Sequence, residues 1–197
     1  MQQRSADTQQ RIMQSARDLF ASVGYDAAGV SQICEMARVS KGAFYHHFPS
    51  KHDLFMALLK EWLETLDKEV LVRHHQDKDV PATIERMAAS ANFIFTDGQG
   101  QFPMFMEFWQ QSIRDELVWE ETKQPFLKYF YYFSKLVEDG VCEGSLRAVD
   151  SAAAARAILG LALGIILQGM LYPQQADWKN ELQNSMHLLL RGMQNGQ

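Results

Sequence analysis

The sequence has few of the residues that dominate loop-built, disulfide-bonded or membrane-spanning proteins. Only five of its 197 residues are proline and twelve are glycine, which is too few for a β-sandwich or a low-complexity array. Its two cysteines, Cys34 and Cys142, form no spacing pattern, so neither a disulfide framework nor a cysteine-based zinc site is expected. The longest uninterrupted apolar run, Ala157 to Leu167, has 11 residues and is too short to cross a bilayer. Because the N-terminal residues also lack the apolar stretch of a signal peptide, we expect a cytoplasmic protein with no membrane partner.

The sequence does have enough apolar residues for a core, and its charge is unevenly distributed. Hydrophobic residues make up 47% of the chain and charged residues 22%, which is the composition of a folded globular protein. Residues 1–60 carry seven Lys and Arg against five Asp and Glu, whereas the remainder carries 12 against 19. This asymmetry hints that the N-terminal part meets an anion, although an ordinary solvated surface would give the same count.

Apolar residues recur at helical spacing along nearly the whole chain, and no alternating strand pattern lasts more than a few residues. The expected fold class is therefore all-α, with about nine helices. The predicted helices lie near residues 8–23, 31–37, 41–47, 50–73, 81–95, 104–113, 125–139, 151–172 and 176–193, with a loop at 142–149.

The segment Val30–Lys51, VSQICEMARVSKGAFYHHFPSK, is the most informative part of the sequence. Two short helices with a tight turn form the helix-turn-helix arrangement, whose second helix enters the DNA major groove. Phe44 and Phe48 would anchor that second helix to a core, which leaves small residues and phosphate-binding donors outside. The outward residues that we expect to contact DNA are Ser40, Lys41, Gly42, Ala43, Tyr45, His46 and His47.

Lys51 opens the next predicted helix and is expected to join these DNA contacts. The first turn of a helix has free backbone N–H groups and the positive end of the helix dipole, so an anion is already favoured there. We therefore expect the Lys51 ammonium to contact a phosphate.

The run VSKGAFYHHFPSKHDLF resembles the signature of the tetracycline-repressor (TetR) family of bacterial transcriptional regulators. The anchors of that signature are matched by Val39, Ser40, Lys41, Gly42, Phe44, Tyr45, His47, Phe48, Ser50, Lys51 and Leu54. The motif-level resemblance covers residues 8–55. It implies a helix-turn-helix DNA-binding domain at residues 1–55 and a helical effector-binding and dimerisation domain at residues 56–197.

Two positions depart from the family's pattern. Gly29 stands where the family commonly has a Ser or Thr that caps the first short helix and binds phosphate, and Ser31 is the candidate to replace that DNA contact. Arg38 stands where the family commonly has glycine in the tight turn. A left-handed backbone at a non-glycine residue costs about 1 kcal/mol, so Arg38 is a further candidate for a phosphate contact.

The remaining chemistry-bearing residues have ordinary explanations. His46 and His47 point about 100° apart on a helix, and no other ligand is patterned near them, so no metal site is expected. Cys34 fits a core position and Cys142 a loop, where a redox role for its thiol stays open. No phosphate loop, nucleophile elbow or dinucleotide fingerprint occurs, so we expect neither an enzyme nor a cofactor.

Aromatic residues are concentrated in one stretch, because 13 of the 22 lie between Phe93 and Phe133. Aromatic helices with methionines can enclose an apolar ligand, although a well-filled core is the alternative explanation. The family resemblance also implies a small-molecule effector here. The residues that we expect to bind it are Trp62, Met87, Phe105, Trp109, Phe130 and Phe133. An inward carboxylate, with Glu107 as the candidate, would favour a hydrophobic cation over a neutral ligand or fatty acyl chain.

Small residues mark the eighth predicted helix, where Gly160 and Gly164 lie four residues apart and would let another helix approach closely. In the resembling family the last two helices pair with their copies, so we expect a homodimer through residues 150–193; packing within one chain is the alternative.

The sequence thus predicts a dimeric regulator, most simply a repressor released from double-stranded palindromic operator DNA by an apolar or aromatic effector. The alternative is a small helical carrier or enzyme that uses the aromatic pocket.

Overall fold

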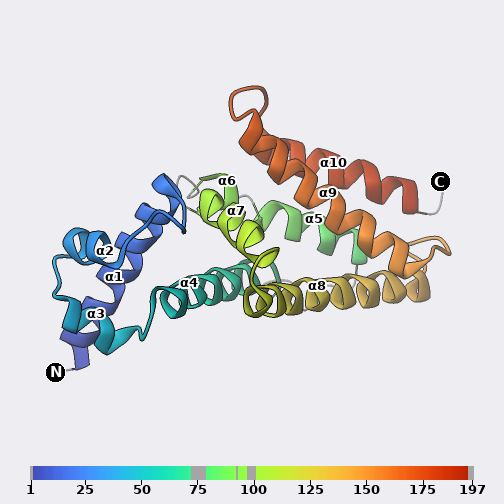
Figure 1. The fold of residues 1–197 in the computed structure, drawn as a ribbon. Coiled ribbons are helices and arrows are strands. Elements are labelled where there is room, and N and C mark those ends of the chain that lie inside the picture. Colours follow the sequence, from blue (N-terminus) through green and yellow to red (C-terminus); the bar gives the residue numbers. More distant parts are fainter. Residues whose placement is uncertain (1, 72–78, 92, 97–100, 195–197) are drawn as a thin grey trace. The chain divides into compact units, whose positions relative to one another are not determined.

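The computed structural model describes residues 2–71, 79–91, 93–96 and 101–194, and its regular structure in these ranges is entirely helical (Figure 1). The expected all-α class is therefore confirmed. The elements are α1 (Gln2–Val23), α2 (Val30–Ala37), α3 (Lys41–His47), α4 (Lys51–Leu66), the π-helix η1 (Asp67–Leu71), α5 (Val80–Ser90), α6 (Phe93–Thr96), α7 (Gln101–Ser112), α8 (Glu116–Glu143), α9 (Ser151–Leu171) and α10 (Trp178–Met193).

Several predicted helix boundaries follow from capping chemistry that the sequence displays. Gly24 ends α1 with a φ of +82°, and its N–H donates to the Phe20 carbonyl at 2.9 Å. Ser50 and Asp53 cap the start of α4, since the Asp53 N–H donates to Ser50 Oγ at 3.1 Å. Asp150 caps α9 in the same way, accepting from the Ala153 N–H at 2.7 Å.

Several predicted helix boundaries are wrong. The helix predicted over 81–95 is divided into α5 and α6. The helix predicted to begin at Pro125 begins at Glu116, because Asp115 Oδ1 accepts hydrogen bonds from the Leu117 and Val118 N–H groups at 2.9 and 3.4 Å. Pro125 therefore lies inside α8. The same helix extends to Glu143, so Cys142 is an exposed helical residue and not a loop residue.

The chain divides into two compact units, which are described separately. The first unit contains Met1–Glu64 and Asp97–Thr122, and the second contains Thr65–Thr96 and Lys123–Gln197. The core of the first unit is formed by α1–α4 with Phe108 and Val118 from α7 and α8. The division into a DNA-binding domain at 1–55 and an effector-binding domain at 56–197 stays a prediction, because compactness alone assigns no role to either unit.

The second unit packs α10 against α9 and α5. Its core contains Ile84, Met87, Phe133, Val137, Ala155, Ile158, Leu182, Met186 and Leu190, among others. Gly169 permits a close approach within this unit, because a Cβ at that position would lie 2.8 Å from Phe95 Cε1 and 3.0 Å from Trp178 Cγ. Gly160 and Gly164 differ, since a Cβ on either would meet no atom within 4 Å.

Helix α9 is apolar well beyond its buried face. By length and composition, Ser151–Gly169 could cross a membrane, and 22% of this stretch is buried. The uninterrupted apolar run in the sequence is shorter than this stretch because Arg156 interrupts it. Core helices of soluble proteins pass the same test, and α9 buries Ala154, Ala155, Ile158 and Ile165 in the second unit.

Candidate nucleic-acid interface

Helices α2 and α3 are held by buried apolar side chains, as a helix-turn-helix requires. Ile33, Cys34 and Ala37 of α2 are buried, and so are Phe44 and Phe48 on and after α3. Burial raises the pKa of the Cys34 thiol, so this cysteine is a neutral core residue. Lys41, Gly42, Tyr45 and His46 are exposed on α3, with Ala43 and His47 half-buried. The structure thus brings these six expected DNA-binding residues together on a helix of seven residues.

Ser40 positions the start of α3. Its backbone is extended, and its Oγ accepts a hydrogen bond from the Ala43 N–H at 3.1 Å. The hydroxyl hydrogen remains a donor, so the same side chain can cap α3 and reach an acceptor beyond it.

Arg38 has the left-handed backbone that the sequence analysis inferred for the turn. Its φ is +54° and its ψ +50°, and its N–H donates to the Glu35 carbonyl at 3.1 Å. The following N–H, of Val39, donates to the Cys34 carbonyl at 3.0 Å. These bonds close the end of α2. The Arg38 side chain is exposed beside the start of α3.

A substitution at this turn separates backbone strain from DNA contact. Arg38→Gly should raise the free energy of unfolding by about 1 kcal/mol, because glycine adopts a left-handed conformation without steric cost. Arg38→Ala keeps the strain and should not show the gain. Both variants lose the guanidinium and should weaken DNA binding alike. Urea unfolding measures the first effect, and a glycine variant less stable than the wild type would contradict it.

The start of α2 is capped without the hydroxyl that the family commonly has. Gly29 is extended and has no side chain, but its N–H donates to Gln32 Oε1 at 2.9 Å. One half of a capping box is therefore kept by Gln32. Ser31 is exposed in the first turn of α2 and free of that structural task.

Lys51, which the sequence predicts to contact phosphate, has partners within the protein. The side chain is half-buried, and its Nζ donates to the carbonyls of Tyr25 at 2.8 Å, Ala28 at 3.0 Å and Asp26 at 3.5 Å. Its Nζ also lies 4.4 Å from the centroid of the Tyr25 ring. An ammonium has three N–H donors, so these carbonyls can occupy all of them.

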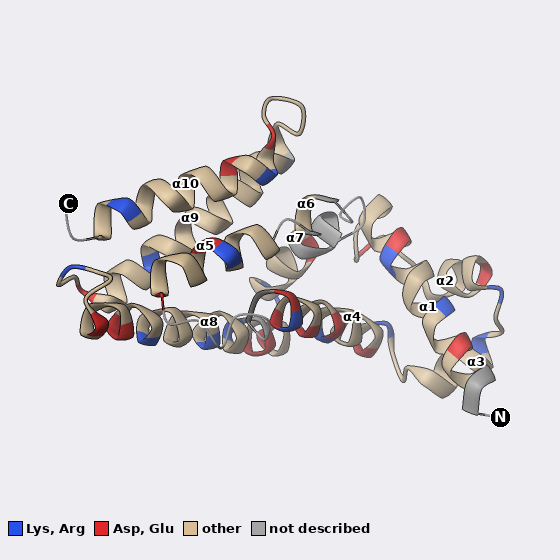
Figure 2. Ribbon diagram, turned by 180° about the vertical axis from the view of Figure 1, so that it is seen from behind, with Lys and Arg blue, Asp and Glu red and all other residues tan. Residues whose placement is uncertain are grey.

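The charges around the helix-turn-helix are mixed, as Figure 2 shows for α1–α3. Two of the arginines have structural partners. Arg17 Nη2 lies 2.6 Å from Glu61 Oε2, and Arg11 Nη1 donates to the Ala37 carbonyl at 3.2 Å. Within the described ranges, no ion pair involves Arg38 or Lys41, so these two cations can meet an external anion.

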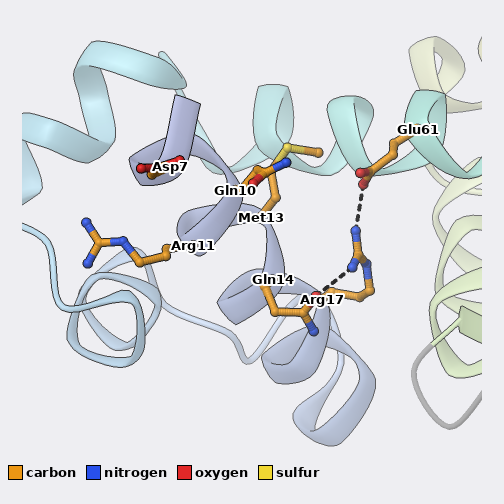
Figure 3. A pocket seen from close by; sticks show the side chains of 7 residues that line it. All are labelled: Asp7, Gln10, Arg11, Met13, Gln14, Arg17 and Glu61. Carbon is orange, nitrogen blue, oxygen red and sulfur yellow. Dashed lines mark hydrogen bonds and ion pairs between the residues drawn. The ribbon is translucent and has the colours of Figure 1, made fainter. Parts of the chain in front are cut away.

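An open groove of about 460 Å³ lies between α1 and α4 (Figure 3). It is lined by Asp7, Gln10, Arg11, Met13, Gln14, Arg17 and Glu61. Apart from Met13, the lining residues are polar or charged, with charges of both signs, and none of them is among the six residues expected to bind the effector.

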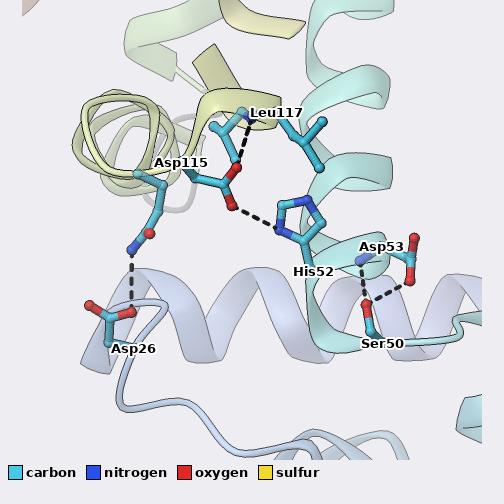
Figure 4. A network of polar contacts seen from close by, with 8 residues as sticks. Asp26, Ser50, His52, Asp53, Asp115 and Leu117 are labelled. Carbon is cyan, nitrogen blue, oxygen red and sulfur yellow. Dashed lines mark hydrogen bonds and ion pairs between the residues drawn. The ribbon is translucent and has the colours of Figure 1, made fainter. Parts of the chain in front are cut away.

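A polar network joins the turn after α1 to the turn between α7 and α8 (Figure 4). Asp26 accepts from Gln111 Nε2 at 3.5 Å and from Arg114 Nη1 at 3.4 Å, while His52 Nδ1 lies 3.6 Å from Asp115 Oδ2. All of these residues belong to the first unit. The sequence does not predict this network, because its members are far apart in the chain and only Asp115, as a possible helix cap, signals any part of it.

The six expected effector-binding residues are divided between the two units. Trp62 packs on Phe108 in the first unit, with ring centroids 6.3 Å apart, and Trp109 is 37% exposed there. The Phe105 side chain lies outside the described residues. In the second unit Met87 and Phe133 are buried in the core, whereas the half-buried Phe130 ring lies 5.0 Å from the Arg156 guanidinium carbon. A common pocket formed by these residues stays a prediction.

Two carboxylates near these aromatic residues already have partners. Glu107 Oε1 accepts from Gln111 Nε2 at 3.4 Å in the first unit. In the second unit, Asp67 on η1 pairs with Lys128 and accepts from the Tyr129 hydroxyl at 3.1 Å. Burial, reinforced by Asp67, raises the pKa of Tyr129, so its phenol stays protonated and donates. Among the described residues, no group of His, Cys, Asp and Glu could hold a metal ion.

Comparison with known proteins agrees with this geometry. Residues 12–58 match the family described as bacterial regulatory proteins, tetR family. The HTH-type transcriptional regulator UidR of Escherichia coli K12 is 24% identical over 84% of this chain and 83% of its own length.

Solved structures of other regulators share the fold. A putative transcriptional regulator from Saccharomonospora viridis in complex with choline has a TM-score of 0.84 at 16% identity, covering 97% of this chain and all of its own. AibR in complex with isovaleryl coenzyme A and operator DNA has a TM-score of 0.73 at 17% identity, covering 91% of this chain and 96% of its own. The family match over residues 12–58, which contain the helix-turn-helix at residues 30–47, and the similarity to UidR together indicate a transcriptional regulator of the tetR family.

Proposed function

We propose that this chain is a cytoplasmic, homodimeric repressor that binds palindromic operator DNA and leaves it when a small molecule binds. The observation that carries the proposal is the two-sided character of α3. Phe44 is fully buried, whereas its neighbour Tyr45 is 52% exposed, so the helix is fixed from beneath while its outer face remains available. A short, rigidly packed helix with an uncovered polar face is what a major groove accommodates.

The proposed contacts divide by their chemistry. Arg38 and Lys41 would neutralise phosphates, and Ser31 and Ser40 would donate hydroxyl hydrogen bonds to the backbone. Gly42 and Ala43 would let α3 approach closely, which leaves Tyr45, His46 and His47 to meet base edges or backbone. Lys51 is left out of this set because its ammonium is occupied within the protein.

The exposed face of α9 supports a homodimer. One stripe of this face recurs at spacings of three and four and consists of small or apolar residues, exposed except for the half-buried Gly164: Ala153, Ala157, Gly160, Gly164, Leu167 and Leu171. A stripe of this kind on one helix fits a second helix at close range. We propose that the second helix is the α9 of another copy, with α10 completing the interface within residues 150–193. One recognition helix reads too few base pairs for selectivity, so function also favours two copies.

The proposed effector is a small molecule that binds among aromatic side chains. Choline and isovaleryl coenzyme A are ligands of the two regulators whose folds resemble this one. Aromatic side chains in both units of this chain favour a mostly apolar or aromatic molecule, and an uncovered carboxylate would extend that to a hydrophobic cation.

The proposal predicts that the purified protein selects a specific duplex from a random-sequence pool. The selected sites should be palindromic, with half-sites about one helical turn, ~34–36 Å, or somewhat more apart. The selected duplex should bind at least about a thousandfold more tightly than a random one. Sequencing of the bound fraction followed by fluorescence anisotropy tests this. Failure to enrich any sequence, together with binding of small molecules, would favour the alternative of a helical carrier or enzyme.

A further inference from the structure

We infer that Lys51 is a positioning residue for DNA recognition, which acts by closing the helix-turn-helix into a ring and not by contacting phosphate. The inference rests on the proposed DNA-binding function and concerns how that function is achieved. It starts from the three carbonyls that the Lys51 ammonium contacts, those of Tyr25, Asp26 and Ala28.

The Lys51 contact joins two parts of the chain that flank α2 and α3. Residues 25–28 lie in the connection between α1 and α2, and Lys51 is the first residue of α4, shortly after α3 ends at His47. The bond from Lys51 to the Ala28 carbonyl joins residues 23 positions apart. It therefore fastens the two ends of the segment that contains α2, the turn and α3. A link that closes a loop reduces the conformations available to everything inside it.

The ring is attached to the core of the first unit at its closing point. The Lys51 ammonium lies over the Tyr25 ring, and that ring lies 4.6 Å from Phe55 and 5.4 Å from Phe20, centroid to centroid. Phe20 and Phe55 are fully buried. The link therefore fixes both ends of the segment to the helices α1 and α4 that carry it.

The same geometry argues against a phosphate contact by Lys51. Moving its Nζ to an external phosphate would leave the part-buried Tyr25 and Ala28 carbonyls without this donor, and an unpaired polar group costs up to about 1–3 kcal/mol when it is fully buried. Lys41 is the matched comparison, because it is exposed at the start of α3 and has no ion-pair partner among the described residues.

The test compares Lys51→Met with Lys41→Met, since methionine keeps an unbranched apolar stem and removes the ammonium. In the free protein, hydrogen exchange should quicken at the amides of residues 24–30 and 40–48 in Lys51→Met and stay unchanged in Lys41→Met. This measurement involves no DNA. It therefore tests whether Lys51 orders the segment from α2 to α3 even if the wild type selects no duplex and the proposed function fails.

The DNA measurement uses a duplex selected by the wild type and a random duplex of the same length, titrated with salt well below the unfolding temperature. Lys51→Met should lose about tenfold or more in affinity for the selected duplex, less for the random one, with an unchanged salt slope. Lys41→Met should weaken both duplexes alike and lower the salt slope by about one. A salt slope that falls by one in Lys51→Met with unchanged hydrogen exchange would overturn the inference. So would faster exchange with both affinities intact, because Lys51 would then only stabilise the fold.

Discussion

Replacing Gly164 by leucine should convert the proposed dimer into a monomer at low micromolar concentration. Gly164 lies in the small-residue stripe of α9, and a Cβ there would meet no atom within 4 Å beyond the backbone of its own helix. The leucine therefore fits the isolated protomer but would separate two helices that approach each other at this residue. Two linked DNA-binding domains bind more tightly than one by a factor of about 10²–10⁴. The affinity of the Gly164→Leu variant for the selected duplex should therefore fall by at least about a hundredfold.

Sedimentation velocity measures the dimer directly, and two controls isolate the interface. Ala148→Leu places the same leucine side chain at an exposed residue between α8 and α9 and should leave the protein dimeric. Gly169→Ala should lower the unfolding temperature without dissociating the dimer, because its Cβ would clash with Phe95 and Trp178 inside the protomer. A fully dimeric Gly164→Leu protein would place the interface elsewhere, and partition of the wild type into lipid vesicles would reassign the apolar face of α9.

The helical elements that sequence could predict are those whose signals are local. The positions of α2 and α3 followed from Phe44, Phe48 and the short turn, and the left-handed turn followed from the position of Arg38 in the motif. The start of α8 was missed because Pro125 is a strong helix-start signal, while the cap that begins the helix, Asp115, is an ordinary-looking acidic residue. One proline costs a hydrogen bond, which a helix of 28 residues can lose without ending.

The candidate site was harder to predict where a residue's partners come from distant parts of the chain. The sequence position of Lys51, at the start of a helix, predicts a phosphate contact. In the structure its ammonium donates to the carbonyls of Tyr25 and Ala28, which lie 26 and 23 residues away in the chain. The sequence likewise predicted one pocket for Met87, Phe133, Trp62 and Trp109. Met87 and Phe133 are core residues of the second unit, whereas Trp62 and Trp109 belong to the first. Periodicity shows which face of a helix is apolar, but it does not show which other segment covers that face.

The largest loss of stability should come from Phe44→Ala. Phe44 is fully buried, and its ring lies 6.1 Å from that of Phe48 in the core beneath α3. Truncating a buried phenylalanine to alanine costs about 3–5 kcal/mol, against a total of about 5–15 kcal/mol for a typical domain. Because α3 has only seven residues and cannot persist without packing, it should unfold first, and selective DNA binding should be lost. Urea unfolding and hydrogen exchange at α3 measure the two effects.

Tyr45→Ala is the matched control, because Tyr45 is the next residue on α3 and is 52% exposed. Its ring contacts the edge of Phe44, with centroids 5.2 Å apart, so its removal should change the free energy of unfolding by no more than about 1 kcal/mol. Affinity for the selected duplex should nevertheless fall by about tenfold or more, since Tyr45 belongs to the face proposed to meet DNA. The two variants together distinguish a residue that stabilises α3 from a residue through which α3 contacts DNA. If Tyr45→Ala binds the selected duplex as tightly as the wild type does, α3 does not present this face to the groove, and the assignment of its outward residues is wrong.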